Sequence, residues 1–130
     1  MIVDSSALVA IVFREPGYET LRAKLEAPRA VPAGIGAPTA AELGLVLSAR
    51  LQRDARTIVA GLLQLLEIST VPFSNEHGRA AVEAYWHFGK GRHRAALNFG
   101  DCLTYATAKL ARQPLLFTGD DFPHTDLDAA

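Results

Sequence analysis

Five carboxylates stand where the sequence predicts that a strand ends or a helix begins: Asp4, Glu42, Asp101, Asp120 and Asp121. Taken singly, each has an ordinary structural explanation as a helix cap, a partner of the helix dipole or a turn residue. Gathered in one place they would repel, because two carboxylates about 4 Å apart raise the energy by roughly 4 kcal/mol at an effective dielectric constant near 20. A hard divalent cation, Mg²⁺ or Mn²⁺, would offset that repulsion, since these ions prefer oxygen ligands.

Whether these acids can meet depends on the elements that carry them. Short apolar runs predict strands at residues 1–3, 30–35, 68–73 and 115–117, and apolar residues recur at helical spacing between these runs. Because parallel strands need crossover connections, the alternation of strands and helices predicts an α/β fold. We expect a three-layer sandwich in which helices flank a central, mostly parallel sheet of four to five short strands.

The ligand crevice of such a sheet lies outside the carboxyl ends of its strands. Asp4 follows the first predicted strand, and the pair Asp120 and Asp121 follows the last one. Glu42 and Asp101 fall in the first turns of two predicted helices. We therefore expect all five acids to be able to share one edge of the sheet.

Local patterns predict where individual elements begin. Ser5 or Ser6 can cap the first helix, and Asn98 can cap the helix that contains Asp101. Thr39 and Glu42 have the spacing of a capping box, in which the glutamate bonds back to the first residue of the helix. Because residues 30–35 lie in a stretch rich in Gly and Pro, they predict only a weak or edge strand.

Composition restricts the class of protein. With 130 residues, of which 49% are hydrophobic and 21% charged, we expect one globular domain over residues 1–130. The formal net charge of -1 gives no overall attraction to polyanions, so any nucleic-acid site must be local. Cys102 is the only cysteine, which excludes an internal disulfide and suits a cytoplasmic protein. The apolar stretches are too short for a membrane span, and no membrane association is expected.

The segments around the acids resemble the PIN-domain family, and most closely its VapC-type toxins from bacterial toxin–antitoxin pairs. The resemblance extends over nearly the whole chain and rests on IVDSSALVAI, TAAELGLVL, GKGRHRAALNFGDCLTYATAKL and PLLFTGDDFPHTDL. It implies a metal-dependent endoribonuclease that uses Mg²⁺ or Mn²⁺, is inhibited by a cognate antitoxin protein and forms a homodimer. It also implies that Asp4, Glu42 and Asp101 are the first three acids of the metal site, with Ser6 as a supporting hydroxyl residue.

The fourth acid has two candidates. In the family an acidic turn precedes a phenylalanine, and here both Asp120 and Asp121 precede Phe122, with Asp121 slightly preferred. Side-chain chemistry suggests a separate role for one of the acids, because a carboxylate that is not fully committed to a metal can accept a proton from water. Glu42 is our candidate for that role. The resemblance also implies that the RNA products carry a 5′-phosphate and a 3′-hydroxyl.

Two further segments predict partner binding. No acid occurs between residues 84 and 100, where a glycine-containing loop carries Lys90, Arg92, His93 and Arg94. Such a loop can bind RNA phosphates beside the acidic site, although an ordinary solvated loop has the same composition. The helix over residues 58–66 is apolar almost all round, which favours burial in the fold, contact with a second copy of the chain, or contact with the antitoxin.

Two alternatives to a nuclease remain at this point. A phosphotransfer enzyme would form a covalent phosphate on Asp4. Such enzymes usually need a second acid two residues after the nucleophile or an acid pair before it, plus a lysine from a later strand, and the neighbours here are Val3, Ser5 and Ser6. A nuclease-like module that only binds proteins would not need its acids, yet every acid position is filled. Cleavage of RNA by the purified protein would separate these possibilities.

Overall fold

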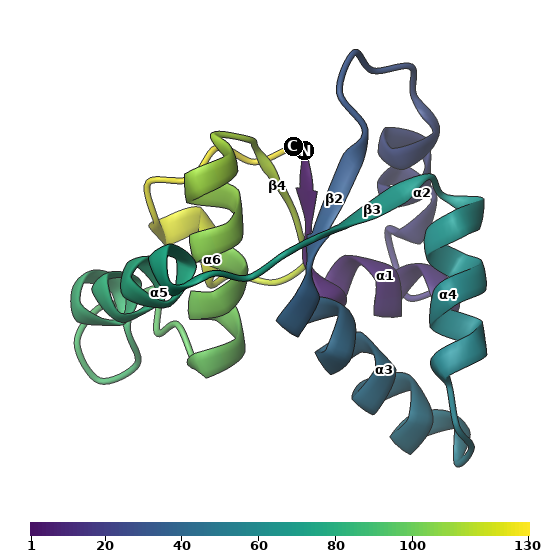
Figure 1. Cartoon of the computed structure of the whole chain (residues 1–130), viewed down its shortest axis with the longest axis horizontal. Helices are drawn as coiled ribbons and strands as arrows, with labels where there is room; N and C mark the ends of the chain where they lie inside the picture. Colours follow the sequence, from purple (N-terminus) through teal and green to yellow (C-terminus); the bar gives the residue numbers. More distant parts are fainter.

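The computed structural model describes all 130 residues and has a parallel four-stranded sheet at its centre (Figure 1). The strands run in the order β3-β2-β1-β4. Their bounds are β1 Ile2–Val3, β2 Ala33–Gly36, β3 Ile68–Val71 and β4 Leu115–Leu116. Every pair of neighbours is parallel, so the carboxyl ends of all four strands lie along one edge.

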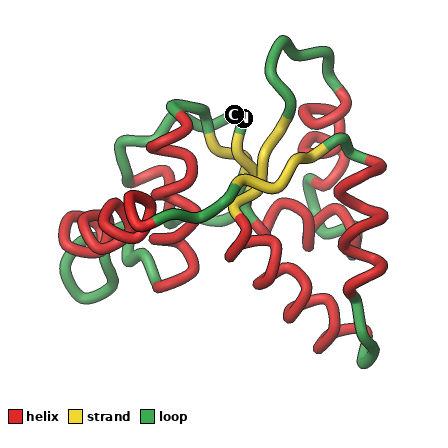
Figure 2. The backbone as a smooth tube through the Cα atoms, viewed as in Figure 1, coloured by secondary structure: helices red, strands yellow, loops and turns green.

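Helices connect the strands and cover both faces of the sheet (Figure 2). Six are α-helices, and a short 3₁₀ helix, η1, follows β4. Their bounds are α1 Ser5–Val12, α2 Tyr18–Glu26, α3 Ala37–Leu51, α4 Arg56–Leu65, α5 Asn75–Phe88, α6 Phe99–Ala111 and η1 Phe122–His124. Helices α1 to α4 lie on one side of the sheet and α5 and α6 on the other, which confirms the predicted three-layer α/β sandwich (Figure 1).

Alternating side chains of the neighbouring strands β1 and β4 build a separate core on each face. Val3 and Leu116 face the cluster that contains the buried side chains of α1, α2 and α3. Ile2 and Leu115 face the cluster of α5 and α6. Because both faces are covered, these strands are continuously apolar, as the runs in the sequence predicted.

The prediction that residues 30–35 form an edge strand is wrong. Strand β2 lies inside the sheet between β1 and β3, and all four of its residues are buried. Glycine is needed there: a Cβ on Gly34 would lie 2.9 Å from Val71 Cγ2 and 3.1 Å from Ile2 Cδ1, side chains of the two neighbouring strands. The missing side chain, which made the segment look weak, is what allows close packing.

The predicted capping box at the start of α3 is also wrong. The helix begins at Ala37 with Gly36 as its N-cap, and Pro38 occupies one of the first positions, where no N–H bond is lost. Thr39 is therefore already inside the helix and buried. Glu42 is consequently not used for capping, and its carboxylate is free to face α6.

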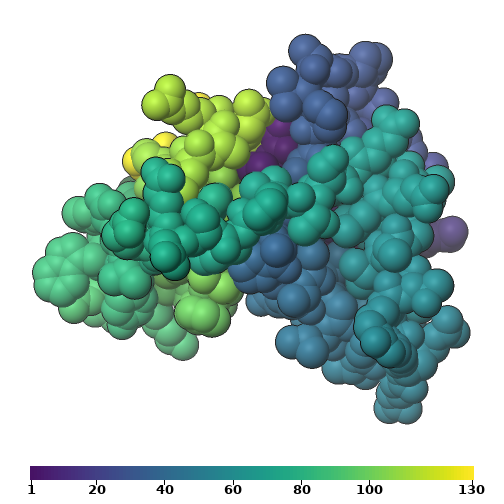
Figure 3. All heavy atoms as spheres, viewed as in Figure 1, coloured from purple at the N-terminus to yellow at the C-terminus, as the bar shows by residue number.

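The two sides of the molecule are joined across one face by β3 and the segment that leads into α5 (Figure 3). The chain ends lie next to each other beside β1 and β4 (Figure 1). The C-terminal segment lies along β4, with Leu115 N–H bonded to Asp128 O and Ala130 N–H bonded to Leu115 O. None of the helices combines the length and the apolar character that a membrane crossing requires.

Candidate active site

Asp4 lies at the carboxyl end of β1, where the chain turns directly into α1. It is the N-cap of that helix, so neither Ser5 nor Ser6 is, and its Oδ2 accepts a hydrogen bond from Ser6 N–H at 3.0 Å. Its own backbone N–H donates to Leu116 O of β4 at 2.9 Å. With only 5% of its surface exposed, Asp4 is a rigidly held carboxylate at the carboxyl edge of the sheet.

The second oxygen of Asp4 is bonded from the far end of the sequence. Thr104 Oγ1, on α6, donates to Asp4 Oδ1 at 2.9 Å. Thr39 Oγ1, on α3, lies 3.0 Å from Thr104 Oγ1, and both threonines are buried. Asp4 is thus connected by hydroxyl groups to the two helices that carry Glu42 and Asp101.

Glu42 reaches the same region from α3. Ser5 Oγ donates to its Oε2 at 2.8 Å, which fixes the carboxylate against the start of α1. Its Oε1 lies beside Gly100, where an added Cβ would be 2.6 Å away. The absence of a side chain at position 100 therefore allows Glu42 to approach the N-terminus of α6, one residue before Asp101.

Asp101 is held by the capping box that Asn98 forms with it, which confirms Asn98 as the N-cap of α6. Asp101 Oδ2 accepts from Asn98 N–H, and Asp101 N–H donates to Asn98 Oδ1, both at 2.9 Å. Burial raises the pKa of Asp101 to about 6; the bond from Asn98 opposes this, and the negative charges of Asp4, Asp121 and Glu42 raise it further. Four carboxylates from four parts of the chain therefore share one electrostatic environment.

The two consecutive acids after β4 differ in their relation to this group. Asp121 begins the turn of η1 and acts electrostatically on Asp101, whereas Asp120 is not among the charges that shift the pKa of Asp101. Ser6 supports this region in two ways: its backbone N–H donates to Asp4 Oδ2, and its Oγ accepts from Thr118 N–H at 3.1 Å. That bond fixes the segment between β4 and Asp121 against the start of α1.

The donor set fits a hard divalent cation. Its members offer only carboxylate oxygens, and none of the five ion pairs of the chain includes Asp4, Glu42, Asp101 or Asp121. No three acidic, histidine or cysteine side chains lie close enough together to form a complete metal cage. Mg²⁺ does not need one, because it usually keeps several waters and binds through one or two carboxylates.

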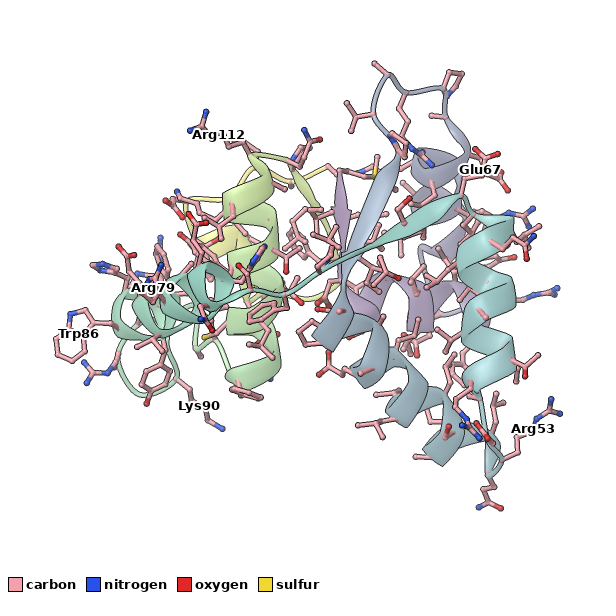
Figure 4. The ribbon with its side chains drawn as sticks, in the orientation of Figure 1. Arg53, Glu67, Arg79, Trp86, Lys90 and Arg112 are labelled. Carbon is pink, nitrogen blue, oxygen red and sulfur yellow. The ribbon has the colours of Figure 1, made fainter.

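The basic loop lies at the outer end of the α5 and α6 side. Trp86 and Lys90 project outward there, away from the sheet (Figure 4). Arg92 lies over the Trp86 ring at 3.9 Å from its centroid, and His93 Nδ1 accepts from Ala95 N–H at 3.1 Å. Neither Lys90 nor any of Arg92, His93 and Arg94 makes a hydrogen bond or ion pair with the acids.

Helix α4 is amphipathic and packs on the core by one face. Ile58, Val59, Leu62 and Leu63 pack half-buried against the core of the α1 to α4 side. Leu65, at the end of the helix, is 79% exposed. A cavity of about 830 Å³ lies between this end of α4 and the loop that follows α2. Of the alternatives that the sequence left open for this helix, burial within the fold holds for one face only.

Four residues of the site escaped the sequence reading: Ser5, Thr39, Gly100 and Thr104. Their contacts with the acids span long separations in sequence, such as the 100 residues between Asp4 and Thr104. One signal was present, because Thr39 and Thr104 each stand one helical turn from an acid on the same helix. Spacing alone could not tell that those two helices face each other.

Comparisons with known proteins found related sequences along almost the whole chain. The PIN domain matches residues 1–127 of the chain. Ribonuclease VapC36 of Mycobacterium tuberculosis is 52% identical over 128 residues, covering 98% of this chain and 91% of that protein. Ribonuclease VapC42 of the same species is 40% identical over an alignment of 131 positions, covering 100% and 98%.

Two solved structures share the fold at low sequence identity. The crystal structure of Mycobacterium tuberculosis VapC20, a sarcin-ricin loop cleaving toxin, has a TM-score of 0.78 at 14% identity and covers 99% of this chain and 97% of that one. A toxin–antitoxin complex from Klebsiella pneumoniae contains a chain with a TM-score of 0.68 at 21% identity, covering 96% and 92%. At these identities the likeness concerns the fold.

Proposed function

This chain belongs to the PIN-domain family, and within it to the VapC ribonucleases, and from this premise we propose that it is a metal-dependent endoribonuclease toxin controlled by a cognate antitoxin. The observation that carries the metal dependence is the environment of Asp101, whose pKa is raised by burial and by the charges of three other carboxylates. We place its action in the cytoplasm, where its single thiol stays reduced.

We propose that Asp4, Asp101 and Asp121 form the cation site, with one or two of them binding the ion directly and the others acting through its waters. Asp121 is preferred to Asp120 because, of these two, only Asp121 acts electrostatically on Asp101. When bound, a divalent ion activates a water and neutralises charge that develops on the phosphate oxygens. The identity of the ion, Mg²⁺ or Mn²⁺, follows from neither the ligands nor their order, since both ions take carboxylates.

Glu42 is placed to act on the attacking water. Its Oε2 is occupied by the Ser5 hydroxyl, whereas Oε1 faces the N-terminus of α6 beside Gly100 and can accept a proton. As the water oxygen bonds to phosphorus, the bond from phosphorus to the 3′ oxygen breaks. Glu42 takes one proton of the attacking water, and the leaving 3′ oxygen takes a proton from a solvent water, so the products carry a 5′-phosphate and a 3′-hydroxyl.

Phosphotransfer through Asp4 is a poorer explanation of this site. Both oxygens of Asp4 already accept hydrogen bonds, from Ser6 N–H and from Thr104 Oγ1, and the side chain is almost completely buried. A nucleophile needs free access for in-line attack on phosphorus, and these contacts deny it.

Metal removal provides the direct test of the proposed function. Purified protein, freed of any antitoxin, is incubated with end-labelled structured RNAs, including the loop that the VapC20 toxin cleaves. We expect cleavage in Mg²⁺ or Mn²⁺, none in EDTA, and products with 5′-phosphate ends. Cleavage that persists in EDTA and leaves 5′-hydroxyl ends would identify a contaminating metal-independent ribonuclease, and no cleavage of any RNA would favour a module that only binds proteins.

The basic loop is proposed to bind RNA through Lys90, Arg92, His93 and Arg94. We expect the double replacement Arg92→Ala and Arg94→Ala to weaken RNA binding and to lower the slope of log affinity against log salt by roughly 1 to 2, since each lost phosphate contact removes about 0.7 to 0.9. Fluorescence anisotropy at several salt concentrations measures this slope. The matched control is Arg53→Ala with Arg112→Ala, which removes the same charge elsewhere on the surface (Figure 4). Equal slopes in both double variants would exclude the loop as the RNA contact.

We propose two protein partners, a cognate antitoxin and a second copy of this chain. An antitoxin segment or a second copy of the chain would cover apolar surface at the exposed end of α4, around Leu65. A homodimer predicts twice the monomer mass of 14.0 kDa in light scattering of the purified toxin.

A further inference from the structure

Helix α6 lies unusually close to the segment formed by β2 and the start of α3. Three pairs of residues face each other along this contact: Thr107 with Gly36, Thr104 with Thr39, and Gly100 with Glu42. A Cβ on Gly36 would lie 2.7 Å from Thr107 Oγ1, and a Cβ on Gly100 would lie 2.6 Å from Glu42 Oε1. A glycine in each outer pair therefore permits the approach that brings the two threonines of the middle pair into hydrogen-bond distance.

The direction of the hydrogen bonds in the middle pair follows from the number of protons available. A threonine hydroxyl donates one hydrogen bond, and Thr104 donates its proton to Asp4 Oδ1. The 3.0 Å bond between the two hydroxyls must therefore run from Thr39 to Thr104. Donation by Thr39 polarises the Thr104 hydroxyl and strengthens its bond to the carboxylate.

The position of this hydrogen-bond chain relates it to the acids. Thr39 lies one helical turn before Glu42 on α3, and Thr104 lies one turn after Asp101 on α6. Asp4 is the last acceptor of this hydrogen-bond chain and lies at the carboxyl end of β1. One buried chain of hydroxyl groups thus connects the three elements that supply Asp4, Glu42 and Asp101.

We propose that Thr104, supported by Thr39, is a positioning residue that orients Asp4 and sets the affinity of the acidic site for its divalent cation. With Ser6 N–H on Oδ2 and Thr104 on Oδ1, the rotation of the Asp4 carboxylate is fixed, and each oxygen keeps a lone pair for a ligand. Groups behind metal ligands typically change metal affinity by about 10- to 100-fold when removed. The inference rests on the proposed function, because it concerns the same site.

Titration with Mn²⁺ alone, in calorimetry or by the loss of the free-ion electron paramagnetic resonance signal, tests this role without any RNA. Thr104→Val keeps the shape but removes the hydroxyl, and we expect it to weaken Mn²⁺ binding about tenfold or more. Thr104→Ser keeps the hydroxyl and is expected to bind Mn²⁺ within about threefold of the wild type. Thr39→Val is expected to have the smaller effect, since Thr104 can still donate to Asp4.

The matched control is Thr107→Val, on the same helix and equally buried, because its hydroxyl donates only to Leu103 O of its own helix. Equal weakening in Thr104→Val and Thr107→Val would mean a general effect of packing and would overturn the proposal, as would unchanged binding in Thr104→Val. If the wild type neither binds Mn²⁺ nor cleaves RNA, the proposed function fails and this inference with it. If the wild type does both while Thr104→Val matches it, the inference fails alone.

Discussion

We expect Asp4→Asn to reduce the rate of RNA cleavage by about 1,000-fold or more and to leave the protein folded. The rate falls because the site loses the carboxylate at the carboxyl edge of the sheet, and several kcal/mol of transition-state stabilisation by a metal correspond to about this factor. The fold persists because Asn is as good an N-cap as Asp and its oxygen can still accept from Ser6 N–H. Initial rates on a labelled RNA in Mg²⁺ give the effect, and circular dichroism gives the fold.

Asp54→Asn is the appropriate control for this loss. Asp54 is an exposed acid that pairs with Arg56 outside the crevice, and its replacement removes the same charge. We expect its cleavage rate to equal that of the wild type within about twofold, because exposed surface pairs contribute little. An Asp4→Asn protein that keeps more than about a tenth of the wild-type rate would contradict the role of Asp4, since the loss of a carboxylate that binds the metal lowers the rate much further.

We expect Asp101→Asn to stabilise the metal-free protein at neutral pH. The pKa of Asp101 is raised from 3.8 to about 6, so the folded protein holds this proton more tightly than the unfolded chain does. The stability gained from binding this proton is fully present below about pH 4 and is lost as the pH rises through about 6. Above that pH the wild type carries a charge that the folded site disfavours, and Asn does not.

The size of this effect follows from the same pKa. The difference between the ordinary pKa of 3.8 and the raised pKa of about 6 corresponds to about 3 kcal/mol of stability. Because the side chain is only half-buried, solvent screening reduces this value, and the lost attraction between a negative charge and the helix N-terminus reduces it further. We expect a gain of about 1 kcal/mol in the free energy of unfolding at pH 7.5 in EDTA, shrinking toward zero near pH 4. Urea unfolding at several pH values measures it.

Asp120→Asn serves as the control for this stability change. It removes the neighbouring charge of the last turn, yet Asp120 does not contribute to the raised pKa of Asp101. Its free energy of unfolding should follow the wild-type curve at every pH. If Asp101→Asn were less stable than the wild type in EDTA at pH 7.5, the four carboxylates would not be in electrostatic contact.

Helices and strands were predictable from the sequence where the spacing of apolar residues agreed with the capping and turn residues at their ends. Asn98, followed by helical spacing, gave the start of α6 correctly, and the apolar run before the last acids gave β4. Strand β2 was misjudged because glycine reads as a weak strand former, whereas here its lack of a side chain makes room for Val71 and Ile2. That reason depends on neighbours that are distant in sequence.

The acids of the candidate site were predictable because strand ends meet at one edge of a parallel sheet. What supports them was not, since Thr39 looked like a helix cap and Thr104 like a helix-face residue among apolar neighbours. Both roles arise only when α3 and α6 pack together. The family resemblance favoured Asp121 over Asp120 only slightly, because two consecutive residues in a turn differ only in the direction that the folded backbone gives them.

The order of the strands has a consequence for when toxicity can begin. The first strand pairs with the last one, Ile2 beside Leu115, and this contact closes a very long loop, which makes it a slow step of folding. Until it forms, Asp4 has neither Leu116 nor Thr104 beside it. A nascent or partly unfolded chain therefore carries separate acids and no nuclease, so its host is exposed to harm only after the last strand has docked.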